Sequence, residues 1–397
     1  MKTAFKFTSL IILIALTSFN YQKDRGEVGT DGNKFIWTGT GQAFVPNYAM
    51  IDMLTSDLGK INKNNLDWFI DEFINEHGFT GVHVPVYGQW FHIGDKKVTE
   101  KDSIPDQRTF DKLKMIITEV YDAGGCTHLW VWGDHSRRQT SKSTKDGIMG
   151  RQEKMLMDKI AEELGPLKGW TMGYGFDLWE WVSEEELDTW HDYMWSKKGW
   201  DQLMGARSQK NELEQISEKM DYSSYEYHKP SHNELVAMIN TRPEKPSFSE
   251  DRYRIRYSSN YPEKDYNEEE TVRGLWHHTM AGGVAAIWGN LEEDGVYSNR
   301  ESLKCFSEFW NDEERFKKDM EPDNALTNGY CLREGNRIFV YYIEDSDVLE
   351  YSFKGKKKDV IAIDTRKEYR EIPLGRKTAG EYVFEALYKS DWAIAAA

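Results

Sequence analysis

The feature that most constrains the fold of this chain is an eightfold alternation of short β-type runs with helix-like stretches. The runs lie between Phe35 and Asn290, and most are followed by apolar residues at helical spacing. Strands that alternate with helices form parallel sheets with crossover helices. Eight repeats therefore predict an α/β fold of the (β/α)8 TIM barrel type.

The helix-like stretches are predicted over 66–74, 110–121, 153–164, 232–239, 268–280 and 300–310. Ser183 and Glu186 form a capping box before one more helix. Only KNELEQISE separates the fifth and sixth runs, which predicts a short or degenerate helix there. The β-type runs are FIWTGTG from Phe35, FTGVHVPVY from Phe79, CTHLWVWGD from Cys126, WTMGYGFD from Trp170, QLMGAR from Gln202, MDYSSYEYH from Met220, KPSFSED from Lys245 and GVAAIWGN from Gly283.

The two ends of the chain differ from this central part. Lys2, Lys6 and the apolar run LIILIAL are typical of a signal peptide, which we predict over residues 1–20. The run is too short to span a bilayer, so we expect a secreted or periplasmic protein without a membrane anchor. From Pro322 the sequence changes to alternating β-type runs with turn signals. We therefore predict a barrel domain over 30–318 and a small antiparallel β-sandwich domain over 322–397.

The composition excludes several classes of partner and cofactor. A formal net charge of −16 would repel nucleic acid and anionic membranes. Cys126, Cys305 and Cys331 are too few for a disulfide framework, and we expect Cys126 in the core. No CxxC or HExxH motif occurs and the histidines are scattered, so we expect no metal and no other cofactor. Aromatic residues make up 14% of the chain, which suits a cleft that stacks sugar rings.

Carboxylic acids follow the fourth and seventh β-type runs. In a barrel these positions lie at the carboxyl ends of the strands, where active sites form. Hydrolysis of a glycosidic bond needs two carboxyl groups, one to protonate the leaving oxygen and one to attack or to activate water. Glu250 closes the seventh run. After the fourth run, Asp177 is favoured as acid/base, while Glu180 remains an alternative that could instead bind substrate or tune the other acid.

Arginines are concentrated near the same strand ends. Arg252, Arg254 and Arg256 alternate after Glu250, and Arg137, Arg138 and Arg207 follow other runs. Because Arg binds sulfate and carboxylate through paired hydrogen bonds, this pattern favours an anionic substrate, sulfated or uronic. Salt bridges that hold loops or orient the acids explain the arginines equally well.

Further aromatic and polar side chains at the strand ends are candidates for sugar binding, although each alone is more often part of a barrel core or rim. His83 is expected to be buried within its strand. The candidates are Trp37, His83, Tyr87, Gln89, Trp90, Trp132, Asp134, His135, Tyr225 and Trp288.

With these residues in place, the chain resembles the clan A glycoside hydrolases, and among them the apiosidase-like group, whose barrel is followed by a small β domain of the collagen-binding type. The resemblance lies in GWTMGYGFD, in the strand-seven Glu250, in TVRGLWHHTMAGGVAAIWGN and in AIDTRKEYREIPLG. The usual Asn-Glu pair after strand four is replaced here by FDLWE. The resemblance implies a retaining mechanism with Glu250 as nucleophile, and carboxyl groups about 5 to 5.5 Å apart.

The sequence thus favours a retaining glycoside hydrolase that acts on a polysaccharide or oligosaccharide. Two alternatives remain open. One is a non-catalytic carbohydrate-binding barrel that keeps the aromatic cleft. The other is a polysaccharide lyase, in which arginines neutralise a uronate and Tyr or His removes its proton. The oligomeric state does not follow from the sequence.

Overall fold

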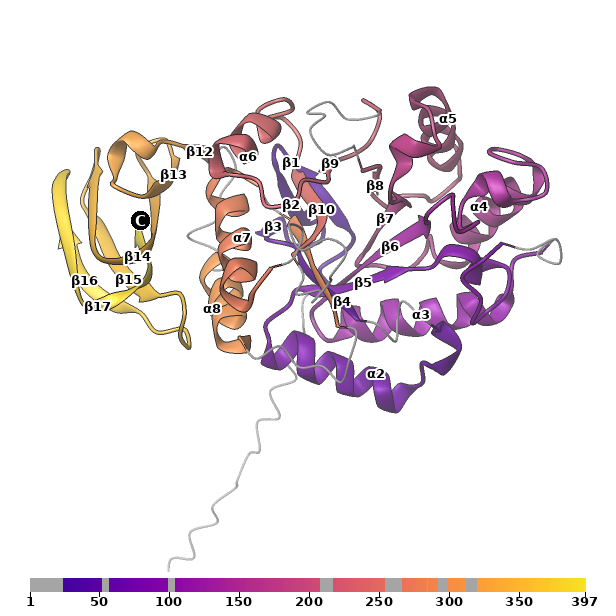
Figure 1. Cartoon of the computed structure of the whole chain (residues 1–397), viewed down its shortest axis with the longest axis horizontal. Coiled ribbons are helices and arrows are strands. Elements are labelled where there is room, and N and C mark those ends of the chain that lie inside the picture. The colour runs from indigo at the N-terminus through magenta and orange to yellow at the C-terminus, as the bar shows by residue number, and fades with distance from the viewer. Residues whose placement is uncertain are drawn as a thin grey trace, which may run out of the picture.

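The computed structural model describes residues 24–51, 57–98, 104–207, 217–253, 266–283, 285–291, 299–311 and 320–397. They form an eight-stranded parallel sheet surrounded by helices, a three-stranded sheet near the start, and a six-stranded antiparallel sheet at the C-terminal end (Figure 1). The predicted signal peptide over 1–20 lies outside the described residues, as does most of KNELEQISE.

The parallel sheet has the strand order of a barrel. Its strands are ordered β8-β7-β6-β5-β4-β11-β10-β9, and every neighbouring pair is parallel. Seven of the eight predicted runs supply one strand each. The strands are β4 (Asn47–Ile51), β5 (Gly81–Pro85), β6 (Cys126–Trp132), β7 (Trp170–Gly175), β8 (Met204–Gly205), β9 (Ser223–Tyr225), β10 (Ser247–Tyr253) and β11 (Ala285–Leu291).

The predicted closure of this barrel is incomplete between β8 and β9. These strands have only two and three residues and form no ladder with each other. A backbone hydrogen bond from Asp221 N to Met204 O, 2.9 Å long, crosses the seam. A Cβ atom on Gly205 would lie only 2.2 Å from Cζ of Tyr222, so the tyrosine ring packs directly on the glycine backbone. Side-chain packing thus takes the place of a ladder there.

The prediction that the run from Phe35 is the first barrel strand was wrong. This run forms β2 (Lys34–Trp37), which pairs with β1 (Val28–Asp31) and β3 (Gln42–Phe44) in a separate antiparallel sheet. The Phe35 ring lies 5.6 Å from that of Tyr222 and 6.4 Å from that of Phe248. Phe35 therefore covers the amino end of the barrel, and β4, from NYAMI, is the first barrel strand.

The helices agree closely with the predicted periodicity, and α6, α7 and α8 have the predicted bounds. The capping box is confirmed: Ser183 N donates to Glu186 Oε2 at 2.8 Å, and Glu186 N donates to Ser183 Oγ at 3.3 Å. No helix in the described ranges is long and apolar enough to cross a bilayer. The α-helices are α2 (Lys63–Phe69), α3 (Gln107–Asp122), α4 (Arg151–Glu163), α5 (Glu184–Trp195), α6 (His232–Ile239), α7 (Glu268–Met280) and α8 (Arg300–Trp310). The short helices are η1 (Leu58–Lys60), the π-helix η2 (Ile70–Glu76), η3 (Tyr87–Trp90), η4 (Ser141–Ser143), η5 (Leu178–Glu180) and η7 (Asn324–Leu326).

The C-terminal part is a single antiparallel sheet with the order β12-β13-β14-β17-β15-β16. Its long strand β14 folds back on itself, because the rings of Tyr341 and Tyr351 lie 5.3 Å apart and those of Phe339 and Phe353 lie 6.0 Å apart. The predicted antiparallel β domain is thus present as one bent sheet with its own apolar core, and its classification as a β-sandwich stays a prediction. The strands are β12 (Glu321–Pro322), β13 (Tyr330–Glu334), β14 (Ile338–Phe353), β15 (Lys358–Asp364), β16 (Ile372–Lys377) and β17 (Gly380–Ala396).

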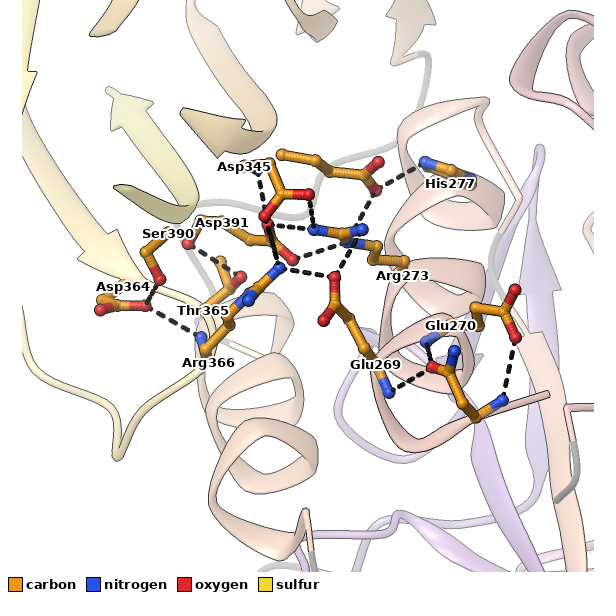
Figure 2. A network of polar contacts seen from close by, with 12 residues as sticks. Glu269, Glu270, Arg273, His277, Asp345, Asp364, Thr365, Arg366, Ser390 and Asp391 are labelled. Carbon is orange, nitrogen blue, oxygen red and sulfur yellow. Dashed lines mark hydrogen bonds and ion pairs between the residues drawn. The ribbon is translucent and has the colours of Figure 1, made fainter. Parts of the chain in front are cut away.

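A polar network fixes this small sheet to α7 (Figure 2). Arg273 on α7 donates through Nε and Nη2 to the two carboxylate oxygens of Asp391, each at 2.8 Å. Arg366 donates to the same Asp391 at 3.1 Å and to Glu269 on α7 at 2.6 Å. Beside the network, the ring of Trp276 on α7 stacks on that of Tyr342 at 4.8 Å. The helix that follows β10 is therefore anchored on the small sheet.

The three cysteines are buried and form no disulfide bond. Cys126 opens β6, and its sulfur lies 3.4 Å from the hydroxyl of Tyr48 on β4. The expectation that Cys126 belongs to the core is confirmed.

Candidate active site

Glu250 on β10 lies at the centre of the barrel interior, and its side chain is fully buried. Its Oε2 accepts a hydrogen bond from Trp130 Nε1 at 2.9 Å. Its Oε1 accepts one from the hydroxyl of Tyr222 at 3.4 Å and lies 3.5 Å from His128 Nε2. A buried carboxylate is costly unless hydrogen bonds satisfy it, and these donors do so.

Strand alternation explains why these side chains meet. Residues two apart in a strand point to the same face, so His128 and Trp130 of β6 both point into the barrel. His83 on β5 joins them, with its ring 4.3 Å from that of Trp130 and 5.2 Å from that of His128. The expectation that His83 is buried within its strand is therefore confirmed.

Arg207, which follows β8, contacts residues from three other strands or their ends and is only 3% exposed. Its Nη2 donates to Asp177 Oδ1 and lies equally near Glu226 Oε2, both at 2.7 Å. Its Nη1 donates to the backbone carbonyl of Glu250 at 3.3 Å, and its guanidinium lies 5.4 Å from the ring centre of Trp130. This buried cation therefore connects the carboxyl ends of β7, β8 and β9 with the middle of β10.

Asp177 lies in a tight turn directly after β7. Its φ angle is +51°, in the left-handed region that non-glycine residues rarely adopt, and such strain is frequent at functional sites. The turn continues as η5, in which Glu180 N donates to the carbonyl of Asp177 at 3.1 Å. The side chain of Asp177 is 31% exposed, so it reaches Arg207 and still contacts solvent. One turn therefore carries both acids predicted after strand four.

Glu180 is exposed, and its surroundings are acidic. Partial burial raises its pKa, and the negative charges of Asp177, Asp134 and Glu226 raise it further, while His135 lowers it. These groups come from the ends of β6, β7 and β9 and lie close enough to act on one carboxyl group. The structure thus brings Asp134, His135, Asp177 and Glu180 together.

Tyr87 and Asp134 are fixed by their backbone conformation or by their side-chain contacts. Tyr87 has a φ angle of +57°, and its ring lies 5.6 Å from that of Phe176, next to Asp177. Asp134 accepts hydrogen bonds from Ser136 N at 2.7 Å and lies 3.4 Å from Arg137 Nε. Tyr87 therefore lies beside the acidic group, and Asp134 within the group is held in place by its own contacts.

Several predicted residues lie apart from the acidic group. Trp132 is fully buried and donates through Nε1 to Glu153 on α4 at 3.1 Å. Burial raises the pKa of Glu153 to about 7. Trp90 and Gln89 are also fully buried and bond to backbone, Trp90 Nε1 to Val131 O at 2.9 Å and Gln89 Oε1 to Leu58 N at 2.8 Å. These side chains support the barrel.

Trp37 and Tyr225 also point elsewhere. Trp37 lies in the N-terminal sheet and stacks on Phe44 at 4.8 Å. The hydroxyl of Tyr225 lies 2.5 Å from His278 Nδ1 on α7, outside the barrel interior. Tyr222 directly precedes β9 and Tyr225 ends it, so the two are three residues apart and point to opposite faces, Tyr222 inward and Tyr225 outward.

The predicted arginines are dispersed. Arg137 has a side chain that is 71% exposed, and Arg138 is exposed, with a φ angle of +58°. Arg252 on β10 lies opposite Ile287 on β11, and Trp288 on β11 lies opposite Tyr253 on β10. Arg254 and Arg256 lie outside the described residues.

The sequence reasoning missed Glu226, although a signal was present. Glu226 directly follows β9, so the criterion that selected Asp177 after β7 also applies to it. His228 lies near it, with Nε2 3.1 Å from Glu226 Oε1. Trp130 and Tyr222 were also missed, because nothing in the linear sequence pairs an indole or a phenol with a distant carboxylate. Within the described ranges no group of His, Cys, Asp and Glu has the arrangement of a metal site.

No protein-family model and no curated protein matches the chain. Solved structures match over almost its whole length. A structure titled "Glycoside hydrolase" has a TM-score of 0.71 and 12% identity, covering 95% of this chain and 97% of that one. A glycoside hydrolase family 5 structure from Bacteroides vulgatus has a TM-score of 0.69 and 12% identity, with 95% and 94% covered.

This chain shares its fold with these two glycoside hydrolases. A second group supports this, since a GH27 β-L-arabinopyranosidase from Geobacillus stearothermophilus matches with a TM-score of 0.51 and 10% identity, covering 89% of this chain and 97% of that one. At such identities the likeness concerns the fold, and function must be argued from the site.

Proposed function

We propose that this protein is a retaining glycoside hydrolase that cleaves a polysaccharide or oligosaccharide by double displacement. The observation that carries the proposal is that Arg207 joins the backbone of the buried Glu250 to Asp177, in the turn that also bears Glu180. The carboxylates come from the fourth and seventh barrel strands. Retaining enzymes need one carboxylate as nucleophile and one carboxylic acid as proton donor.

Glu250 is proposed as the nucleophile. Trp130, Tyr222 and His128 surround its carboxylate with hydrogen-bonding groups, and Arg207 holds the strand backbone beneath it. These contacts fix the direction of the carboxylate, which favours attack from a single angle. The proton donor is proposed to come from the turn after β7.

The substrate is proposed to be a polysaccharide or its oligosaccharides, in accordance with the glycoside hydrolase fold. An anionic, sulfated or uronic substrate is supported by Arg137 and Arg138, which are exposed beside the acidic group. Arg207 gives no such support, because Asp177 and Glu226 already neutralise it. Membership of the apiosidase-like group and export through the predicted signal peptide also belong to the proposal.

The test is a screen of the purified protein against neutral and sulfated polysaccharides, with the anomeric configuration of the product followed by NMR. A product that keeps the configuration of the substrate at first appearance is expected, and an inverted product would refute the retaining mechanism. Products that absorb ultraviolet light would show elimination and hence a lyase.

The matched variants are Glu250→Gln and Glu334→Gln. Both remove a buried carboxylate, but Glu334 lies in the C-terminal sheet. Glu250→Gln is expected to lower kcat by at least about a thousandfold, because the covalent step loses its nucleophile. Glu334→Gln should keep kcat near wild type. Sugar binding without hydrolysis in the wild type would identify a carbohydrate-binding barrel instead.

A further inference from the structure

We infer that Glu180, and not Asp177, donates the proton, and that Arg207 and Glu226 are positioning residues that hold Asp177 as a fixed anion. This inference rests on the proposed function, because it assigns roles within the same site. The sequence pattern alone favoured Asp177 as the proton donor, because that residue directly ends the β-type run.

Asp177 forms an ion pair with a buried cation. Arg207 Nη2 donates to Asp177 Oδ1 at 2.7 Å, and only 3% of the arginine is exposed. An opposite charge at this distance favours the ionised carboxylate. A proton donor must carry a proton in the free enzyme, so Asp177 would have to give up this ion pair to serve as one.

Further contacts hold the Arg207 side chain in the conformation that reaches Asp177. Glu226 Oε2 lies 2.7 Å from the same Nη2, and the backbone carbonyl of Glu250 accepts from Nη1 at 3.3 Å. The rings of Trp130 and Phe176 lie 5.4 and 5.8 Å from the guanidinium. The guanidinium is therefore held from several sides.

Asp177 and Glu226 share the guanidinium of Arg207. Because Asp177 Oδ1 and Glu226 Oε2 each lie 2.7 Å from one nitrogen, they are no more than twice that distance apart. Like charges at such a separation repel each other unless a cation lies between them. Asp177, Arg207 and Glu226 therefore act as one unit. His228 Nε2 lies 3.1 Å from the second carboxylate oxygen of Glu226, Oε1.

Glu180 is surrounded mainly by negative charges, whereas Asp177 is paired with a cation. Within the part of the chain that the structure describes, its side chain forms no ion pair or hydrogen bond. Asp177, Asp134 and Glu226 face it with negative charge, and only His135 opposes them. Partial burial and these charges raise the pKa of Glu180. Two carboxyl groups whose environments favour opposite protonation states are suited to opposite roles.

The chemical step follows from this assignment. The Glu250 carboxylate forms a bond to the anomeric carbon while the bond from that carbon to the leaving oxygen breaks. The proton of Glu180 passes to the leaving oxygen. In the second step the Glu180 carboxylate takes a proton from water, the water oxygen bonds to the anomeric carbon, and Glu250 is released as a carboxylate.

Glu180→Gln and Asp177→Asn separate the two assignments when kcat/KM is measured on pairs of 2,4-dinitrophenyl and phenyl glycosides. Loss of a proton donor slows a poor leaving group by roughly 10² to 10⁴ but spares one that needs no proton. We expect this selective loss, and rescue by azide, in Glu180→Gln. Asp177→Asn should slow both substrates by a similar factor. The reverse pattern would overturn the inference.

Glu226→Gln tests the positioning role through the pH profile. Removing one of the charges that raise the pKa of Glu180 should move the alkaline limb of kcat/KM to lower pH. Glu226→Asp should move it back toward wild type. A purely structural role would lower the rate at all pH values and leave the limb in place.

A titration without substrate completes the test. Carboxyl ¹³C resonances, assigned by their loss in Glu180→Gln and Asp177→Asn, should show Glu180 releasing its proton at a higher pH than Asp177. The opposite order would refute the inference whatever the activity. Full activity in Glu250→Gln would instead refute the proposed function, while the titration order of Glu180 and Asp177 would still stand.

Discussion

Trp130 shows how one side chain on β6 can control the group proposed as nucleophile. Its indole N–H donates to Glu250 Oε2 at 2.9 Å, and its ring also lies near the guanidinium of Arg207. Hydrogen bonds to charged groups are stronger than those between neutral groups. The orientation of Glu250 therefore depends on a donor that carries no charge and cannot titrate.

Trp130→Phe is expected to lower kcat/KM by roughly ten- to a hundredfold, because a hydrogen bond to a buried charge is worth about 1.5–3 kcal/mol. Trp170→Phe is the matched control. It also removes a buried indole donor, but that donor bonds to the carbonyl of Leu164 at 3.1 Å, away from Glu250. Steady-state kinetics on both variants, with unfolding midpoints, checks the prediction. Equal kinetic losses in the two would contradict it.

At the scale of elements, the seam between β8 and β9 matters most for the site. Tyr222, which donates to Glu250, lies at this seam, and its ring packs on the backbone of Gly205. Two short strands without a ladder thus carry Arg207 on one side and Glu226 on the other.

Gly205→Ala tests this packing. The added methyl group would lie 2.2 Å from Cζ of Tyr222, so the ring must move and weaken its contact with Glu250. We expect a loss of roughly 1–3 kcal/mol in the free energy of unfolding and a lower kcat. Denaturant unfolding and kinetics measure both. Tyr222→Phe is the control, since it removes the hydroxyl and keeps the ring. Unchanged stability in Gly205→Ala would show that the ring can move without a loss in the free energy of unfolding.

The elements also show how far the sequence predicts this molecule. Seven strands and the helices follow from periodicity, because each is encoded by local apolar spacing. The first barrel strand does not follow from periodicity, because FIWTGTG is more β-like in isolation than NYAMI. Phe35 is assigned to the separate sheet only by its packing on Tyr222 and Phe248. The acids after β7 and β10 follow from barrel geometry. The ion pairs of Arg207 do not, because they join strand ends far apart in the sequence.

At the scale of the whole molecule, the small sheet and the barrel meet through charge as well as apolar packing. Asp391 is 2% exposed and accepts hydrogen bonds from Arg273 and Arg366 (Figure 2). Burial alone would raise the pKa of Asp391, but the hydrogen bonds from the two arginines outweigh it, and the pKa is lowered.

Asp391→Asn should therefore destabilise the protein by about 1.5–3 kcal/mol at neutral pH, since it removes the buried carboxylate that accepts hydrogen bonds from both arginines. A lowered folded-state pKa gives stability that is present above the unfolded pKa, about 3.9, and is lost as the pH falls through the folded value. The difference between wild type and variant should thus shrink below about pH 4. Unfolding across pH measures it.

Asp345→Asn is the control for this prediction. Asp345 also contacts Arg273, at 3.1 Å, but its side chain is 70% exposed. Exposed ion pairs are worth about 0–1 kcal/mol, so little change is expected. An equal loss in the two variants would show that burial does not decide the strength of the interface.

The attachment of the small sheet to α7 has an evolutionary consequence. Arg273 satisfies a carboxylate from the other domain, and Trp276 is covered by an aromatic ring from it. A recombination event that removed or exchanged the small domain would take the Asp391 carboxylate away from Arg273 and the Tyr342 ring away from Trp276. Barrel and appendage are therefore expected to be inherited together, with substitutions at Arg273 and Asp391 occurring in concert across descendants.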